Sequence, residues 1–140
     1  MAIRKINFDL ERIADHAYNI SKYIVDVDKK MPNHLIKAVE FEKMYDTISS
    51  MFDNVIEAYK TKNVKVARKV FKKDKTVDVI NVNSFNIIED QIKKDQTIIA
   101  EALILFSVVK KLERVGDLIK NISEEIIFYI DAEVIKHKQK

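Results

Sequence analysis

The chain has 140 residues, of which 47% are hydrophobic and 34% are charged, and its formal net charge at pH 7 is +3. It contains one glycine, one proline and no cysteine, so turn-rich β folds, disulfides and thiolate metal sites are excluded. The net charge does not indicate a nucleic-acid partner. No uncharged apolar run approaches the roughly 18 residues of a membrane span, and the N-terminus lacks the apolar core of a signal peptide. We therefore expect an all-α cytoplasmic protein.

The first predicted helix follows a stripe of apolar residues that step by three and four positions from Ile3 to Val27. The segment 28–33 contains the single proline, Pro32, and breaks this pattern, which predicts a linker. A second stripe predicts a helix over residues 34–59.

The third predicted helix begins after Asn63, which suits the N-cap position, and carries a heptad seam with three polar residues in its middle. The seam consists of Ala67, Phe71, Asp74, Asp78, Asn81, Phe85, Ile88 and Ile92. Because the heptad places all of them at core positions, we expect the polar members to be buried or nearly so.

The last predicted helix runs over residues 98–130, after a turn at 93–97 in which Asp95 or Thr97 acts as the cap. Its main stripe consists of Leu105, Val108, Leu112, Val115, Ile119, Ile122, Ile126 and Ile130. The tail after Asp131 has no stripe and is expected to fray. Long helices with short connections predict an elongated antiparallel bundle.

One stretch occurs twice in the chain. Leu10–Ser21 reads LERIADHAYNIS, and Leu112–Ser123 reads LERVGDLIKNIS. Such similarity in register indicates that one structural unit is used at least partly twice. In each copy a Glu and an Asp stand four residues apart, which places both carboxylates on one helix face, where like charges repel.

The acidic pair of the second copy has a counterpart on the third helix. In an antiparallel hairpin, Glu113 and Asp117 lie at the same height as Asp78 and Asp74, because the pairs are equally distant from the turn. The face of the last helix that carries the acids also carries apolar residues, which indicates that it points inward. These residues are Ile99, Leu103, Phe106 and Phe128. We therefore expect four carboxylates to face one another.

Four neighbouring carboxylates cannot all be ionised without help, because each raises the pKa of the others and buried unpaired charge is costly. Three remedies are open: protonation, pairing with basic residues, or binding of a cation. The basic residues near enough in sequence are Lys73, Lys110, Arg114 and Lys120. Oxygen-only ligation suits hard ions such as Mg²⁺, Ca²⁺, Mn²⁺ or oxidised iron.

Other features are less specific. Gly116, the only glycine, lies between Glu113 and Asp117 and either admits an ion or allows tight helix packing. His16 follows Asp15 but has Leu118 as its counterpart in the second copy, so a ligand role is not favoured. We find no phosphate loop, Ser/His/Asp arrangement or zinc-protease motif, so a catalytic role has little support.

A basic run extends from Lys60 to Lys75. It contains Lys60, Lys62, Lys65, Arg68, Lys69, Lys72, Lys73 and Lys75. Such a run either attracts an anionic membrane or an acidic partner, or is a solvated helix face.

The two copies of LER-(I/V)-(A/G)-D, each followed by Asn-Ile-Ser, resemble the signature of the PhoU family of phosphate-transport regulators. Residues 73–78, which read KDKTVD, are similar to the family's second-helix D-x-x-x-D, and residues 133–137 are similar to its common tail. Family members consist of two tandem three-helix repeats. The resemblance implies that residues 1–32 are the last helix of one repeat and that 33–140 form a complete second repeat.

In the family, each repeat binds a metal cluster through one acidic pair from its second helix and one from its third. The resemblance therefore implies one complete metal site and half of another. The complete site consists of Asp74, Asp78, Glu113 and Asp117, and the half site of Glu11 and Asp15. The metal would be iron, magnesium, manganese or zinc. Departures from the family pattern are Leu118, where His is frequent, and Lys111, where Asn or Asp is frequent.

The resemblance implies a non-enzymatic, metal-binding regulator of phosphate uptake and signalling. It would contact a membrane phosphate transporter and a sensor kinase in the cytoplasm, at the inner face of the membrane. The alternatives are a metal-dependent phosphate-handling enzyme and a metal-free helical scaffold with ion-paired acids. Related domains also occur as extensions of sodium/phosphate cotransporters. Because the first helix has half a site and an uncovered face, we also expect a homodimer in which Glu11 and Asp15 of two protomers meet.

Overall fold

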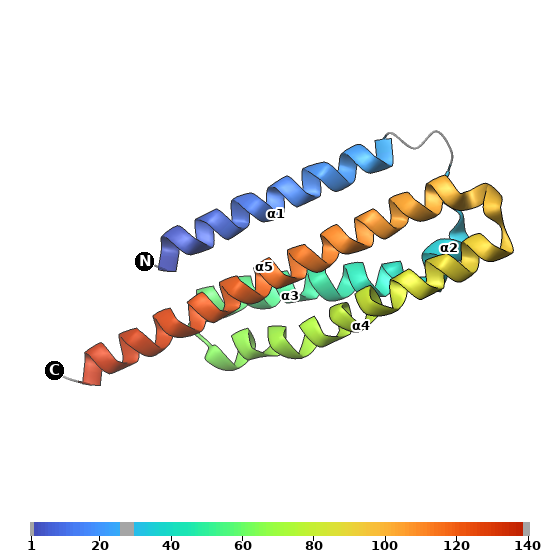
Figure 1. Cartoon of the computed structure of the whole chain (residues 1–140). Coiled ribbons are helices and arrows are strands. Elements are labelled where there is room, and N and C mark those ends of the chain that lie inside the picture. Colours follow the sequence, from blue (N-terminus) through green and yellow to red (C-terminus); the bar gives the residue numbers. More distant parts are fainter. Residues whose placement is uncertain (1, 26–29, 139–140) are drawn as a thin grey trace.

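The computed structural model describes residues 2–25 and 30–138. Its elements are α1 (Ala2–Val25), α2 (Asn33–Ala38), α3 (Phe41–Thr61), α4 (Val64–Lys94), the 3₁₀ turn η1 (Gln96–Ile98) and α5 (Ile99–Lys138). The described part contains no strand, and Figure 1 shows the long helices side by side in alternating directions. The predicted all-α bundle is confirmed. None of the helices in these two ranges has the length and apolarity needed to cross a membrane.

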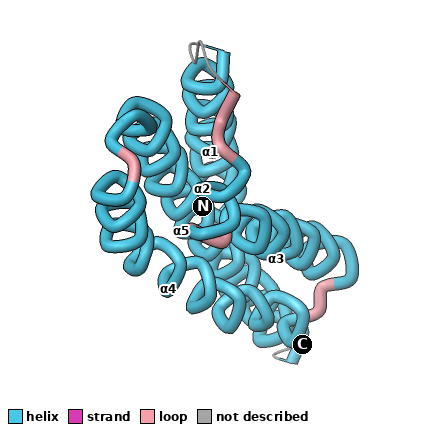
Figure 2. The backbone as a smooth tube through the Cα atoms, turned by 90° about the vertical axis from the view of Figure 1, so that its right-hand side faces the viewer, coloured by secondary structure: helices cyan, strands magenta, loops and turns pink. Residues whose placement is uncertain are grey.

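Helix α5 is the element around which the others pack. It contacts α1, α3 and α4, and Figure 2 shows these helices arranged around it. The apolar stripe predicted for α5 is confirmed, because all eight of its residues are buried in the core, from Leu105 to Ile130. The opposite side of this core comes from α3, whose Met44 and Met51 are fully buried, and from α4.

Two helix boundaries differ from the prediction. The predicted helix over 34–59 is divided into α2 and α3, because Glu40 adopts a left-handed backbone conformation with φ of 55°. The sequence there contains no glycine that would indicate such a break. The predicted frayed tail is helical to Lys138. Its first turn is held by Glu133, which accepts from Lys62 at 2.7 Å and from Tyr129 at 2.8 Å.

The predicted caps are confirmed. The Asn63 side chain accepts from the backbone N–H groups of Lys65 and Val66, which satisfies the first turn of α4. The Asp95 carboxylate accepts from the Thr97 backbone N–H at 2.9 Å and from its hydroxyl at 2.6 Å. The predicted end of the first helix at Val27 lies outside the described residues, and α1 is described to Val25.

The seam predicted for the third helix was only partly right. The buried side of α4 is formed mainly by Val66, Val70, Val77, Ile80 and Ser84, whereas Phe85 is 59% exposed. The physical reason is that α4 packs against both α3 and α5, so its buried arc is centred between these two neighbours. The predicted seam is one flank of that arc.

The inward direction predicted for the acidic face of α5 was wrong at both ends of the helix, whereas Phe106, Glu113 and Asp117 in its middle are partly buried. Ile99, Leu103 and Phe128 on this face are 50%, 54% and 69% exposed. The α4–α5 hairpin thus presents Asp78, Glu113 and Asp117 along one edge of the bundle, where they are partly buried. Asp74 and Glu101 differ from these residues, because they are buried, at 5% and 7% exposed.

Helix α1 packs antiparallel on α5, as the contact of Lys5 with Glu125 near one end and of Tyr23 with Lys111 near the other shows. The residues that face α5 are Ile6, Asp9, Ile13, His16 and Ile20. The apolar residues Leu10 and Ile24 of the predicted stripe lie at the exposed side. The division of the chain at residue 32 stays a prediction.

Candidate metal centre

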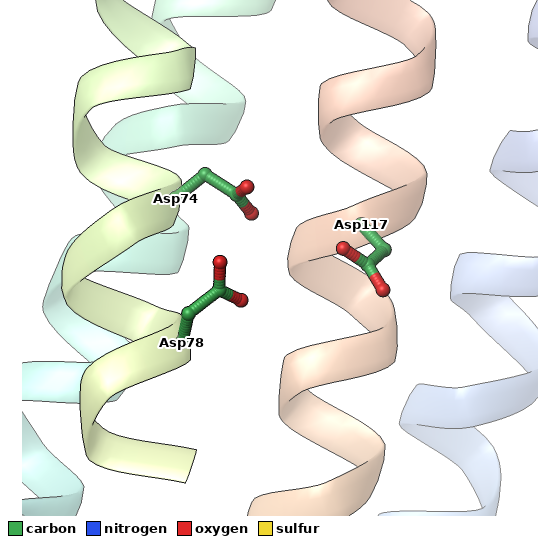
Figure 3. A group of neighbouring side chains, drawn as sticks. All are labelled: Asp74, Asp78 and Asp117. Carbon is green, nitrogen blue, oxygen red and sulfur yellow. The ribbon is translucent and has the colours of Figure 1, made fainter. Parts of the chain in front are cut away.

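Three of the predicted acidic side chains meet at the edge between α4 and α5. One carboxylate oxygen from each of Asp74, Asp78 and Asp117 lies within 4.8 Å of those of the other two. Figure 3 shows the two α4 carboxylates and that of Asp117 on α5 pointing toward the same space. The spacing of four residues on α4 stacks Asp74 and Asp78 on one face, and the antiparallel register brings Asp117 to the same height.

Asp74 is the most buried member of this group. Asp74 is 5% exposed, and its Oδ1 atom is buried without a hydrogen-bond partner among the described residues. A buried carboxylate oxygen without a donor is costly, because it has lost its water and gained nothing in exchange. This atom is therefore the most direct indication in the structure that a ligand belongs here.

Lys120 supplies the positive charge at this edge. Its ammonium donates to Asp74 Oδ2 at 2.7 Å and to Asp117 Oδ1 at 3.4 Å. Hydrogen bonding to Asp74 raises the pKa of Lys120, partial burial opposes the shift, and the charges of Asp74 and Asp117 add to it. Of the four basic residues that the sequence offered as ion-pair partners, Lys120 pairs with these carboxylates.

The other candidates have different partners. Lys73 points to α3, where it donates to the Ser50 hydroxyl and, at 2.7 Å, to Asn54 Oδ1. Lys110 lies over the Phe106 ring at 5.2 Å. Arg114 lowers the pKa of the Glu113 carboxyl but makes no ion pair with it in the described structure.

The pKa values of two carboxyl groups at the site are raised. Partial burial raises the pKa of Asp78, and the negative charges of Asp74 and Asp117 raise it further while Lys120 opposes them. Partial burial also raises the pKa of Glu113, helped by Asp117 and Asp78. Glu113 is therefore electrostatically part of the group, although its carboxylate lies outside the 4.8 Å set.

Gly116 lies where the Asp74 carboxylate meets α5. A Cβ atom at this position would lie 3.5 Å from Val77 Cγ1 and 3.9 Å from both Asp74 Oδ1 and Met51 Cε. These are ordinary contact distances, so helix packing alone does not require a glycine here. The missing side chain leaves room on the side of the unpartnered Oδ1 atom.

The acidic pair of the first copy is not brought to a second pair in the described structure. Glu11 and Asp15 are exposed on α1, on the side opposite Ile13. His16 faces α5, and its Nδ1 is buried without a partner in the described ranges. Partial burial lowers the pKa of His16, and the cations of Lys111, Arg114 and Arg12 lower it further against the effect of Asp15.

The sequence indicated the Asp74–Asp78–Asp117 group but not which lysine would join it. Asn81, one turn beyond Asp78, is partly buried as its seam position predicted, and its Oδ1 atom is buried without a partner among the described residues. The heptad position of Asn81 was the only signal available.

Comparison with known proteins identifies the family of the chain. The sequence matches the PhoU domain over residues 41–126, which includes the candidate site and most of α5. The chain belongs to the PhoU family. It is similar to phosphate-specific transport system accessory protein PhoU homologs of Clostridium acetobutylicum and Zymomonas mobilis, with 30% identity over 131 residues and 33% over 128 residues. The homolog 1 of Thermotoga maritima is 27% identical over 129 residues.

These matches cover 94%, 91% and 91% of this chain but only 59%, 53% and 55% of the three relatives. The chain thus spans just over half the length of the PhoU homologs it matches. Their names are those of transport accessory proteins and not of enzymes, in agreement with the prediction from the sequence.

Proposed function

We propose that this PhoU-family chain is a metal-binding regulatory protein of phosphate uptake. The observation that carries the proposal is the Asp74–Asp78–Asp117 group with its buried, unpartnered Asp74 Oδ1 atom. An ion at this position would satisfy that oxygen and neutralise carboxylates whose pKa values are raised in the fold. Bound between α4 and α5, it would join the two helices.

The donor set fits a hard cation. Asp74, Asp78 and Asp117 would be its ligands. The negative charge of Glu113 lies close enough to Asp78 and Asp117 to add to the attraction for a cation. All these donors are carboxylate oxygens, which suits magnesium, manganese or oxidised iron, and zinc also accepts carboxylates.

The test of metal binding is elemental analysis of protein purified without chelator, followed by titration of metal-free protein with Mn²⁺. We expect Asp78→Asn to remove most of the binding and to leave the helical circular dichroism signal unchanged, because Asp78 is at the edge of the core. Asp90→Asn is the matched control, since Asp90 is an exposed aspartate of the same helix. Equal Mn²⁺ binding by both variants would refute this site.

We further propose that the chain acts by contact with a membrane phosphate transporter and a sensor kinase, in the cytoplasm at the inner face of the membrane. Support comes from the names of the relatives, which are accessory proteins of a phosphate-specific transport system. Copurification with tagged transporter subunits, with and without Mn²⁺, tests this contact. Phosphate release from phosphoesters by the metal-loaded protein would instead favour the enzyme hypothesis.

The basic surface of α4 supports binding of the protein to an anionic membrane. Lys65, Arg68, Lys69, Lys72 and Lys75 are exposed on this helix, whereas Lys73 is turned toward α3. Basic residues near an anionic bilayer contribute roughly 1 kcal/mol each. We propose that this surface favours a peripheral position at the membrane.

We also propose that the chain forms a homodimer through the outer face of α1. This face carries Glu11 and Asp15 between Phe8 and Tyr18, two aromatic side chains that are 60% and 61% exposed. A two-fold contact would bring both acidic pairs together, where a cation could bind them. Sedimentation with Mn²⁺ and with chelator tests the proposal, and a monomer under both conditions at high concentration would contradict it.

A further inference from the structure

We propose that Lys120 is a built-in competitor of the cation: its ammonium occupies the carboxylate group in the metal-free protein and must leave when an ion binds. This inference rests on the proposed metal-binding function. In the metal-free protein the Lys120 ammonium holds the carboxylates together. In the metal-bound protein the ion would take over that role.

The contacts of Lys120 place its ammonium within the ligand group. It is bonded to Asp74 at 2.7 Å and to Asp117 at 3.4 Å, and these are two of the three carboxylates that lie within 4.8 Å of one another. An ion that binds the same carboxylates would be only a few Å from this nitrogen. Two positive charges at such a distance repel each other strongly in a partly buried site.

Lys120 is able to leave the site. Its side chain is 30% exposed, whereas that of Asp74 is 7% exposed. A lysine side chain is flexible and its ammonium is strongly hydrated, so the charge can move to water without a change in the backbone. Asp74 has no such freedom. Departure of Lys120 would leave Asp74 buried and unpaired unless a cation arrives at the same time.

The alternative role is that Lys120 orients Asp74 from behind while an ion binds the free Oδ1 atom, as outer-shell groups do in many metal sites. The second contact of Lys120 argues against this role. An ammonium that bridges Asp74 and Asp117 draws together the two ligands across the helix pair, and in doing so occupies the space between them.

The experiment is titration of the metal-free full chain with Mn²⁺ by calorimetry, comparing wild type with Lys120→Met, Lys120→Arg and Lys136→Met. The Met variant keeps a similar length without charge, and the Arg variant keeps the charge. Lys136 is an exposed lysine near the end of α5, so Lys136→Met controls for the change in net charge.

We expect Lys120→Met to bind Mn²⁺ about 10- to 100-fold more tightly than wild type, the range that corresponds to loss of one competing charge-assisted hydrogen bond. The Arg and Lys136→Met variants should remain close to wild type. Without metal, Lys120→Met should melt at a lower temperature, because Asp74 is then buried without a counter-ion. Equal or weaker binding by Lys120→Met would overturn the inference.

A second measurement on the wild-type chain does not depend on how the variants fold. The nitrogen signal of the Lys120 ammonium, followed by NMR, should move from a hydrogen-bonded to a free, solvated lysine position when Mg²⁺ saturates the site. An unmoved signal at saturation would also overturn the inference. If neither wild type nor Lys120→Met binds Mn²⁺ or Mg²⁺, the proposed metal function itself fails.

Discussion

The Lys111 ammonium lies 5.5 Å from the centre of the Tyr23 ring, across the contact between α1 and α5. In the register of the repeated stretch, Lys111 corresponds to Asp9 and Tyr23 corresponds to Glu125. Asp9 and Glu125 are also neighbours, because the Glu125 charge raises the pKa of Asp9. The two copies of the repeat therefore cross antiparallel with equivalent positions in contact, as an approximate two-fold axis would require.

This symmetric contact has one charge that the fold tolerates poorly. Asp9 is 9% exposed, and partial burial raises the pKa of its carboxyl, with Arg12 opposing and Glu125 adding to the shift. When folding raises the pKa of a carboxyl group, the folded protein becomes less stable as the pH rises above the pKa that the group has in the unfolded chain. We expect Asp9→Asn to raise the melting temperature at pH 7 by a few degrees.

The gain from Asp9→Asn should disappear below about pH 4, where the aspartate is protonated in both states. Thermal unfolding of wild type and variant across this range is the measurement. Asp131→Asn, at an exposed aspartate of α5, is the control. A melting temperature at pH 7 that falls in Asp9→Asn would show that the charged form makes a useful contact instead.

His16 should make the same interface sensitive to acid. Partial burial lowers its pKa, and the cations of Lys111 and Arg114 are the next causes. When folding lowers the pKa of a histidine, its contribution to stability is complete at pH values above its ordinary pKa of about 6.5. This contribution is lost as the pH falls below that pKa. We therefore expect α1 to be held less firmly on α5 at pH 5.5 than at pH 7.5.

Amide hydrogen exchange of α1 at the two pH values, corrected for the intrinsic rates, measures this effect. His16→Gln should reduce the difference between them, because glutamine does not titrate. His34→Gln is the control, since His34 is exposed and lies on α2. Equal loss of α1 protection in wild type and His16→Gln on acidification would contradict the prediction.

The core was predictable from the sequence along α5, because its apolar stripe is long and regular. All eight residues of the stripe predicted between Leu105 and Ile130 are buried as expected. The carboxylates were predictable because spacing and hairpin register are both read directly from the chain. The buried side of α4 was predicted only in part, because polar residues interrupt its apolar pattern and leave the centre of the buried arc undefined. The break at Glu40 had no local signal, and the choice of Lys120 over Arg114 depends on side-chain direction.

The basic surface of α4 leads to a prediction that separates charge from packing. Neutralising Lys69 and Lys72 together should weaken binding to anionic vesicles several-fold at 0.1 M salt, because both are exposed. The difference should diminish at higher salt, where screening is stronger. Lys73→Met should instead lower stability by about 1 kcal/mol or more, since Asn54 and Ser50 lose their donor.

Co-sedimentation with phosphatidylserine vesicles and with neutral phosphatidylcholine vesicles measures the electrostatic binding to membranes. Thermal unfolding measures the contribution of Lys73 to stability. Equal sedimentation of wild type with both vesicle types would exclude electrostatic attraction. A Lys73→Met variant with unchanged stability would show that its hydrogen bonds to α3 contribute little.

Gly116 gives the last prediction, because helix stability and ion binding should respond to it in opposite directions. Alanine in place of a mid-helix glycine stabilises by about 1 kcal/mol, and the added Cβ atom would meet Val77 Cγ1 at an unstrained 3.5 Å. We therefore expect Gly116→Ala to raise the melting temperature of the metal-free protein. The same Cβ would lie 3.9 Å from Asp74 Oδ1, on the side where that atom has no partner.

An ion bound to Oδ1 from that side, with its own hydration, would be crowded by the new methyl group. Gly116→Ala should therefore bind Mn²⁺ more weakly than wild type by about tenfold, equivalent to about 1.4 kcal/mol, even though its metal-free form is more stable. Ser107→Ala, at a partly buried serine of α5 remote from the acidic group, serves as the comparison for a small change in the same helix. If Gly116→Ala is more stable and binds Mn²⁺ as wild type does, the room left by the glycine does not serve the ion.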